Sequence, residues 1–481
     1  MPLRPSFNFN TIPPQSQMHL LSASPFQNFE LTRILGTAPT GGCAVAELLE
    51  AIARIRKHDP ESWYSQFHAL AVKAESQAHE LLNSGQRHAA HRAFLRATSY
   101  FRAAPYMLVP TPSPPDVDRR VLHCAERSAL AFQHAARYSD EYSLVDFEIP
   151  FEGHRLPGYL LLPRPLPLPS APAGTSTSSV RHHPVLLNIG GADSTKEELF
   201  FMLGAPALKL DYAVILFDGP GQGLALKRDK IPMTPAFERV TDAVLDALWD
   251  TAERHPEYGL DLGRVAVAGT SLGGHFALRA AAGDGKRGAS ASSTSTSTSE
   301  NEHESANAKT TAAPRIAACA AVDAVYSMWD VAATRMPGWY LGLWTSGYLP
   351  ESVFDWSCQQ HMGLDFATRW EFALVMWIMG CGTPGEVLRA FQRYSLRTAE
   401  GAEMLADVRC PVLLTGAPDT IYVHPALSSE RIRRELSGVR EVQVWVPEGP
   451  GEGSLTGKVG AWEGLAGRVF AFLDRVMGVR R

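Results

Sequence analysis

A series of short apolar runs separated by helical stretches constrains the fold of this chain most strongly. The runs are HPVLLNI, YAVILFD, RVAVAGT, RIAACAAVDA, CPVLLTG and VQVWVP. Helical periodicity fills several of the intervals, as in FERVTDAVLDALWDTAERH. Strands that are apolar along their whole length and alternate with helices are typical of a parallel sheet covered on both faces. The sequence therefore predicts an α/β fold with a mostly parallel sheet.

Two segments precede this alternation. Residues 1–40 are rich in Pro, Gln, Ser and Thr, and predict a flexible N-terminal arm. Residues 41–140 carry apolar side chains at three- and four-residue steps and predict a helical domain, in which Asp59 caps a helix that begins at Pro60. The segments SLVDFEIPFEG and RLPGYLLLPRP then predict an antiparallel strand pair at the start of the sheet.

Two insertions divide the predicted core, which comprises residues 141–325 and 406–481. Residues 285–313 are of low complexity and polar, and we expect a disordered insertion there. Residues 326–405 are helical in character and hold six of the ten Trp residues. We expect this segment to be a helical lid over an apolar substrate pocket, although ordinary helix packing would also explain several of these side chains.

Composition excludes several classes of protein. The chain has 45 Lys and Arg against 50 Asp and Glu, a net charge of −5, which argues against a general nucleic-acid binder. Its six Cys form no CxxC pair, so no zinc site or disulfide framework is predicted, and no motif points to a metal or cofactor. No apolar run approaches the ~20 residues of a membrane span, and the N-terminus does not read as a signal peptide. We expect a cytoplasmic protein without membrane association.

The pentapeptide Gly269-Thr270-Ser271-Leu272-Gly273 is the most specific chemical signal in the chain. It matches GxSxG and lies between an apolar strand and a helix, the context in which this motif forms a nucleophile elbow. A sharp turn there would lift the Ser271 hydroxyl out of the backbone, and the glycines would let strand and helix approach closely. Ser271 is the predicted nucleophile, and the N–H of Leu272 is a predicted oxyanion donor.

Two further strand ends supply predicted site residues. Gly190 and Gly191 follow an earlier strand, where this type of fold places its second oxyanion donor. Asp419 follows the strand PVLLTG, the expected position of the acid in the order Ser, Asp, His. A tight turn and an Asx-turn are the structural alternatives at these two places.

The histidine that should complete the triad is absent from its expected loop. The segment EGPGEGSLTGK after the last strand contains no His, and the last His of the chain is His424. His424 or His275 would have to act from an unusual place, or the chain has given up acyl-enzyme chemistry. Glu452 is the preferred candidate, because burial beside Asp419 would raise the pKa of its carboxylate and make it a more useful base.

Several segments together resemble a known family. DPESWY, RATSYFRAAPYML, LPGYLLLP, GGADSTKEELFF, FDGPGQG and GTSLGG occur in this order. The chain resembles the fungal polyketide-cluster α/β hydrolases, which include a hydrolase that shortens a naphthopyrone pigment and the hydrolases of fusarin and cytochalasan clusters. It is more distantly similar to dihydropseudooxynicotine hydrolase. The resemblance implies an α/β-hydrolase fold, Ser271 as nucleophile, Asp419 as acid, a site between the helical domain and the core, and a homodimer.

The resulting hypothesis is a tailoring enzyme of fungal secondary metabolism. Its small-molecule substrate would be a large, mostly apolar polyketide or polyketide–amino-acid intermediate, and the reaction either hydrolysis or condensation with ring closure. PGEGSLTGK is similar to the loop of cluster hydrolases that act beside hybrid polyketide–peptide synthases, which favours ring closure. Tyr100 and Arg102 would contact a polar substrate group or, alternatively, form inter-domain hydrogen bonds. The competing hypothesis is a non-catalytic ligand-binding or synthase-partner protein.

Overall fold

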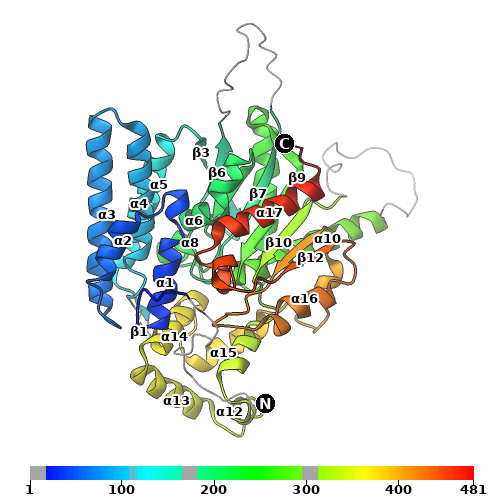
Figure 1. The fold of residues 1–481 in the computed structure, drawn as a ribbon. Coiled ribbons are helices and arrows are strands. Elements are labelled where there is room, and N and C mark those ends of the chain that lie inside the picture. The colour runs from blue at the N-terminus through cyan, green and yellow to red at the C-terminus, as the bar shows by residue number, and fades with distance from the viewer. Residues whose placement is uncertain (1–17, 109–110, 113–114, 165–180, 295–312, 481) are drawn as a thin grey trace.

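The computed structural model describes residues 18–108, 111–112, 115–164, 181–294 and 313–480. A bundle of long helices from the N-terminal part lies against one side of a sheet-containing core (Figure 1). A group of shorter helices, α12 to α15, lies below both in this view (Figure 1). Within the described ranges, no helix combines the length and the apolar character needed to cross a bilayer.

The core is built on a sheet that has eight strands among the described residues. Its spatial order is β12-β11-β10-β9-β7-β8-β6-β3. The strands are β3 (Tyr142–Asp146), β6 (Gly158–Pro163), β7 (His183–Ile189), β8 (Ala213–Phe217), β9 (Leu260–Thr270), β10 (Ala318–Val322), β11 (Val412–Thr415) and β12 (Val442–Trp445). The six strands β12, β11, β10, β9, β7 and β8 each run parallel to their neighbours in this group. β6 is antiparallel to both β3 and β8. The predicted mostly parallel sheet and its antiparallel start are confirmed.

Two small antiparallel pairs lie outside the main sheet. β1 (Thr111–Pro112) pairs with β2 (Pro115–Asp116), and β4 (Ile149–Phe151) pairs with β5 (His154–Leu156).

Helices cover both faces of the sheet. Successive residues of a strand point to opposite faces, so strands that are apolar along their whole length present apolar side chains to both. Leu187 packs with the helices of one face and Leu186 with those of the other. The first face is covered by α9 (Phe237–Arg254), α10 (Leu272–Thr294) and α16 (Ser429–Glu435). The second is covered by α6 (Lys196–Leu199), a π-helical turn (Phe200–Gly204), α7 (Ala205–Lys209) and α17 (Trp462–Met477). The short helix α8 (Gly223–Lys227) follows β8.

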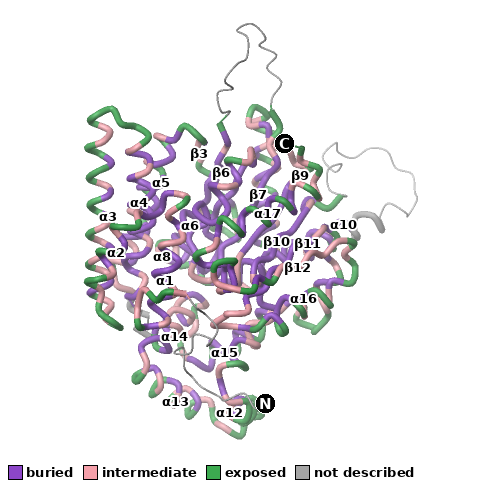
Figure 2. Tube along the Cα trace, in the orientation of Figure 1, coloured by how far each residue is buried: buried purple, intermediate pink, exposed green. Residues whose placement is uncertain are grey.

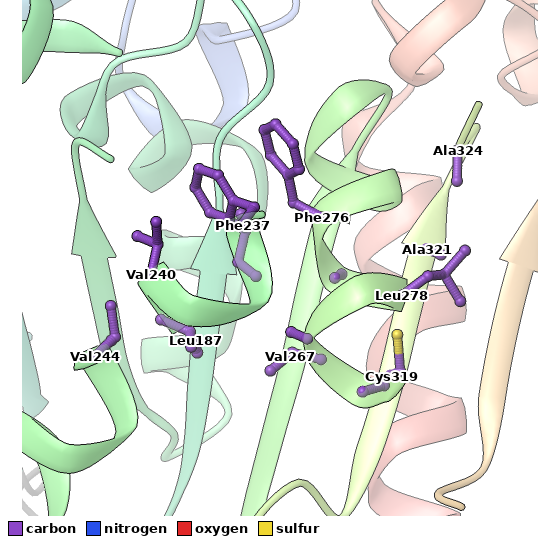
Figure 3. Close-up of a cluster of buried hydrophobic side chains, with 14 of the residues drawn as sticks. Leu187, Phe237, Val240, Val244, Val267, Phe276, Leu278, Cys319, Ala321 and Ala324 are labelled. Atoms are coloured by element: carbon purple, nitrogen blue, oxygen red, sulfur yellow. The ribbon is translucent and has the colours of Figure 1, made fainter. Parts of the chain in front are cut away.

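Packing on the first face holds α10 against α9 and the sheet. Figure 3 shows Phe237 of α9 and Phe276 of α10 above strand residues that include Leu187 and Val267. The two phenyl rings are stacked with their centroids 3.9 Å apart. Each such buried ring contributes roughly 1.5–3 kcal/mol. Figure 2 shows the same pattern across the core, with buried residues concentrated on the strands and on the helix sides that face them.

The N-terminal helices form a bundle of their own. They are α2 (Val45–Ile52), α3 (Pro60–Asn83), α4 (Arg87–Ala103) and α5 (Arg119–Arg137). The predicted cap is confirmed, since the Asp59 carboxylate accepts a hydrogen bond from the Ser62 N–H at 3.0 Å. Trp63 of α3 is fully buried and donates from Nε1 to the Ala103 carbonyl at 2.9 Å.

The expected flexible arm is wrong for the part of residues 1–40 that the structure describes. Helix α1 (Pro25–Leu35) and a 3₁₀ turn (Ala38–Thr40) occupy it, and residues 1–17 lie outside the described ranges. Phe26 and Leu31 are buried against the helical bundle. The polar residues Glu30 and Arg33 are also buried, because each finds an oppositely charged partner. The composition that suggested disorder therefore belongs to an interior helix.

The expected disordered insertion at 285–313 is wrong at its start. α10 continues to Thr294, because a helix anchored on the sheet extends at little cost once nucleated. The Asp284 carboxylate also accepts hydrogen bonds from the N–H groups of Arg315 and Ile316, which fixes the end of the insertion beside α10. Residues 295–312 lie outside the described ranges.

The segment 326–405 consists mainly of short helices. They are α11 (Met328–Arg335), α12 (Gly338–Thr345), α13 (Glu351–Leu364), α14 (Phe366–Met379) and α15 (Pro384–Arg393). Trp344 is buried among residues of this segment itself. Trp370 of α14 is instead buried against the helical bundle, and its Nε1 donates to the Tyr106 carbonyl at 2.7 Å. Ordinary packing therefore accounts for both of these indoles.

Candidate active site

The predicted site residues gather at one edge of the sheet, where the parallel strands end. β7 is followed by Gly190 and Gly191, β9 by Ser271, and β11 by the loop that carries Asp419. β12 is followed by the loop 446–461, which completes this edge. Carboxyl ends of parallel strands are where ligands bind in open α/β sheets.

Ser271 occupies a strained turn between β9 and α10. Its φ is +57°, a left-handed conformation that residues other than glycine seldom adopt. Its N–H donates to the Val322 carbonyl at 2.8 Å, and its own carbonyl accepts from the His275 N–H at 3.1 Å. A Cβ on Gly269 would lie 2.2 Å from the Gly273 carbonyl oxygen, so only glycine fits beneath the turn. This is the geometry expected of a nucleophile elbow.

The loop after β7 lies directly against this turn. A Cβ on Gly191 would be 3.2 Å from the Thr270 carbonyl oxygen, so a glycine allows the close approach. The Gly191 N–H donates to Ser194 Oγ at 3.0 Å, and the loop is fixed by Gln222, whose Nε2 donates to the Gly190 carbonyl at 2.6 Å. The expectation that Gly191 donates to an oxyanion is therefore corrected, because its N–H is already used within the loop.

Two other N–H groups remain available at the turn. Leu272 is the first residue of α10, so its N–H has no acceptor within the helix. The Gly190 N–H has no hydrogen-bond acceptor among the described residues. Two free N–H groups at neighbouring turns are what an oxyanion hole requires, so Leu272 and Gly190 are the candidate donors at this edge.

Asp419 faces a serine at the place where a triad histidine would stand. Ser454 Oγ donates to Asp419 Oδ2 at 2.5 Å, and the Asp419 N–H donates to the Ser454 carbonyl at 3.1 Å. Asp419 Oδ1 has no partner among the described residues. No histidine of the described ranges is hydrogen-bonded to Ser271 or Asp419, and the Ser271 hydroxyl has no hydrogen-bond partner there. Ser454 was not predicted from the sequence, although it lies in the loop where the triad histidine was expected.

A buried ion pair, also missed from the sequence, fixes this loop. Lys458 is fully buried, and its Nζ donates to Asp323 Oδ1 at 2.7 Å and to the Gly416 carbonyl at 2.8 Å. Asp323 Oδ2 accepts from the Gly457 N–H at 2.8 Å. Burial lowers the pKa of Lys458, and Asp323 opposes this. The pair ties the loop after β12 to the ends of β10 and β11, and so holds Ser454 against Asp419.

None of the three candidate bases lies where the sequence hypothesis needs it. His275 is fully buried and donates from Nδ1 to the Val325 carbonyl at 3.0 Å; burial lowers its pKa to about 3. His424 is exposed and caps a 3₁₀ turn by accepting from the Ala426 N–H. Glu452 is exposed at the end of the turn Pro450–Glu452, and has no side-chain partner among the described residues. The expected burial of Glu452 beside Asp419 is therefore wrong.

Tyr100 and Arg102 both serve internal contacts. The buried Tyr100 hydroxyl donates to Glu47 at 3.0 Å and accepts from the Ala44 N–H at 2.9 Å. Both contacts lie within the helical bundle, so the expected substrate contact is corrected to a structural one. Arg102 contributes to a buried cluster of charges between the bundle and the core.

This charge cluster joins α1, α4 and α6 to the loop after β7. It contains Glu30, Arg33, Arg102, Asp193 and Glu198. Arg33 makes two contacts of 2.5 Å, one from Nη1 to Asp193 and one from Nη2 to Glu198. Arg102 Nη2 lies 3.2 Å from Glu198. Because Asp193 follows Gly191 by two residues, the cluster fixes the loop that faces the elbow.

A metal site has no support among the residues that the structure describes. No group of three His, Cys, Asp or Glu side chains there is arranged to hold a metal ion.

Comparisons with known proteins agree with this arrangement. No family model matches the chain. The α/β hydrolase psoB of Aspergillus fumigatus is 40% identical over 468 residues, which cover 96% of this chain and 96% of that protein. The chain belongs to the α/β hydrolases of fungal secondary metabolism. Within this family, the hydrolyase poxO of Penicillium oxalicum is 37% identical, with 96% of this chain and 100% of poxO covered.

Solved structures confirm the α/β-hydrolase fold over almost the whole chain. The 2,6-dihydroxy-pseudo-oxynicotine hydrolase has a TM-score of 0.61 at 18% identity, with 92% of this chain and 95% of that chain covered. AbyA5 has a TM-score of 0.56 at 17% identity, with coverages of 93% and 94%. Coverage this complete includes the N-terminal helical bundle, so the bundle belongs to the shared fold. Membership supports a hydrolase-type enzyme that acts in secondary metabolism.

Proposed function

We propose that this α/β hydrolase closes a ring in a polyketide or polyketide–amino-acid intermediate, by a condensation that does not pass through an acyl-enzyme. The observation that carries the proposal is the hydrogen bond from Ser454 to Asp419, at the position where a triad histidine would stand. The family relationship supports a secondary-metabolite substrate.

Acyl transfer by Ser271 would require a base hydrogen-bonded to its hydroxyl, and no histidine of the described residues makes that bond. A serine hydroxyl is a weak nucleophile until a base within about 3 Å takes its proton. His275 points away to the Val325 carbonyl, and His424 is exposed. Ser271 thus keeps its proton and is suited to donate a hydrogen bond.

The remaining groups suit the chemistry of a carbon acid. The N–H groups of Leu272 and Gly190, with the Ser271 hydroxyl, would stabilise the enolate oxygen formed from a substrate carbonyl. Asp419 Oδ1, which has no partner among the residues that the structure describes, would accept the proton from the carbon beside that carbonyl. The enolate carbon would attack a second carbonyl of the same molecule, and the resulting alkoxide would take the proton back from Asp419. Asp419 would then remove the second hydrogen from the attacking carbon, and the new hydroxyl group would leave with that proton as water while a C=C bond forms. One C–C bond forms and one molecule of water is lost.

The helical segment 326–405 would cover this reaction. It packs on the helical bundle through Trp370 and on the core through Ile378 and Leu396. Exclusion of water by such a cover favours a condensation that releases water, and strengthens the hydrogen bonds to the enolate.

Product profiling tests the proposal. A fungal strain that lacks the gene should accumulate a precursor heavier than the normal product by one water. When this strain is complemented with a gene for the Asp419→Asn variant, conversion of the precursor should be at least ~10²-fold lower than with the wild-type gene. This is the lower end of general acid–base contributions. Glu452→Gln is the matched carboxylate control, and should convert the precursor as the wild type does.

Each other result has a distinct meaning. A product that has gained one water, together with an inactive Ser271→Ala variant, would establish hydrolysis instead. Full conversion by both Ser271→Ala and Asp419→Asn would indicate a binding protein without catalysis.

A further inference from the structure

The hairpin formed by α12 and α13 exposes large apolar side chains. Their exposed fractions run from 42% to 88%, and the residues are Trp339, Leu343, Tyr348, Val353, Trp356 and Leu364. The described ranges of the chain expose no other Trp or Tyr. Proteins rarely leave several such side chains together in water unless the surface binds something.

Contacts between the two helices place four of these side chains on one side of the hairpin. The Trp344 ring stacks on that of Phe354, with the centroids 4.5 Å apart. One turn before Trp344, the Tyr340 hydroxyl is hydrogen-bonded to Ser357, which lies about one turn after Phe354. The helices therefore run in opposite directions, so the residues that precede these four contact residues by one point to the same side. This outer face comprises Trp339, Leu343, Val353 and Trp356.

The outer face carries no charge. The stretch 338–364 contains no Lys or Arg, and its two acidic residues face α15 instead. Glu351 pairs with Arg389 at 2.7 Å, and Asp355 accepts a hydrogen bond from the Gly385 N–H at 2.7 Å. Because 20% of the whole chain is charged, average composition does not account for a neutral surface of this extent.

Glycines leave space around the side chains of the outer face. Gly338 and Gly342 precede Trp339 and Leu343, and a Cβ on either glycine would meet no atom within 4 Å. The hairpin forms one end of the molecule, away from the sheet (Figure 1). The exposed side chains therefore project from this end and do not line a groove.

We propose that the outer face inserts into the headgroup region of a lipid bilayer, without spanning it. Trp and Tyr favour this region, because it accommodates both an apolar ring and its polar N–H or hydroxyl. Since the face is neutral, the apolar area alone attracts it, and a zwitterionic bilayer such as phosphatidylcholine suffices. A protein partner fits the face less well, because it would need pockets shaped to the projecting rings, and the face has no charged group to orient it.

This surface could not be found from the length of apolar runs. The expectation of no membrane association was based on the absence of a run of spanning length, whereas the outer face combines residues of two helices. The hairpin belongs to the segment 326–405, so its insertion would bring the proposed cover of the site to the phase in which apolar intermediates concentrate. The inference goes beyond the proposed reaction and does not depend on it.

Flotation of the full chain with phosphatidylcholine vesicles tests the inference. The wild type should float with the vesicles, and the double variant Trp339→Ser, Trp356→Ser should bind them at least about tenfold more weakly, because it loses the largest apolar areas of the face. Binding by the wild type should change little between about 0.1 M and 1 M NaCl, since salt screens only interactions between charges.

A matched pair of double variants controls for loss of apolar surface in general. Leu343→Ser, Val353→Ser removes one Leu and one Val from the outer face and should also weaken vesicle binding. Val45→Ser, Leu49→Ser removes the same two residue types from α2, where they are similarly exposed, and should bind as the wild type does. All four side chains are exposed, so the thermal unfolding midpoints of the two variants should agree.

Three results would overturn the inference. The first is a wild type that does not float with the vesicles, and the second is equal binding by the wild type and Trp339→Ser, Trp356→Ser. The third is a dimer that the Trp substitutions dissociate, without vesicle binding by the wild type, which would assign the face to a second copy of the chain. Vesicle binding requires no turnover, so failure of ring closure in the product profile would leave these results unaffected.

Discussion

At the scale of single residues, burial separates the side chains that can exchange protons from those that cannot. His275 lies one helical turn after Ser271, yet its ring is fully enclosed and its Nδ1–H is held by the Val325 carbonyl. Asp419 and Asp193 are carboxylates at the same edge of the sheet, and each has one oxygen without a hydrogen-bond partner among the described residues. Chemistry at this edge therefore falls to carboxylates, and His275 has a structural role.

This role of His275 predicts a pH dependence of stability. Burial lowers its pKa to about 3, against about 6.5 in the unfolded chain. The unfolded state thus binds more protons between these values, and stability falls as the pH is lowered through this window. Between pH 7 and pH 5, the free energy of unfolding of the wild type should fall by about 2 kcal/mol more than that of His275→Asn, measured by urea denaturation. His424→Asn should follow the wild type. Parallel curves for the wild type and His275→Asn would contradict the prediction.

At the scale of elements, the loop after β12 depends on the ion pair between Lys458 and Asp323. Lys458→Met leaves the buried Asp323 carboxylate without its cation, which should cost about 3–5 kcal/mol in the free energy of unfolding. The double variant Asp323→Asn, Lys458→Met removes both charges and should be more stable than Lys458→Met alone. Thermal denaturation of the three proteins measures the difference. A double variant that is less stable than the single one would show that the pair does not act as a unit.

The elements that could be predicted from the sequence are those whose determinants are local. The apolar runs predicted the parallel strands, and the Gly269 to Gly273 spacing predicted the elbow, because both depend on neighbours in the chain. Helix α1 was missed because Arg33 finds Asp193 at a separation of 160 residues. The ion pair of Lys458 spans 135 residues. A charged side chain is predicted to be exposed when the partner that would allow its burial is distant in the sequence and therefore unknown.

At the scale of the whole molecule, two Trp residues of the segment 326–405 make contacts of different reach. Trp370 anchors α14 to the helical bundle, where its ring lies 4.8 Å from that of Phe26 and 4.9 Å from that of Tyr106. Trp344 instead stacks on Phe354 within the segment, at 4.5 Å. The two indoles are equally buried, at 5% and 4% exposure, but they hold different parts of the molecule together.

This difference predicts separate responses to two matched substitutions. Trp370→Ala should loosen the contact between α14 and the bundle, so hydrogen exchange should rise in α14 and in α1, which carries Phe26. Trp344→Ala should raise exchange in α12 and α13 and leave α1 unchanged, because its contacts lie within the segment. Each substitution should cost about 3–5 kcal/mol locally. If the segment covers the site, Trp370→Ala should also weaken conversion of the native substrate more than Trp344→Ala does, since only the former frees the segment from the bundle. Equal exchange in α1 for both variants would show that Trp370 does not anchor the segment.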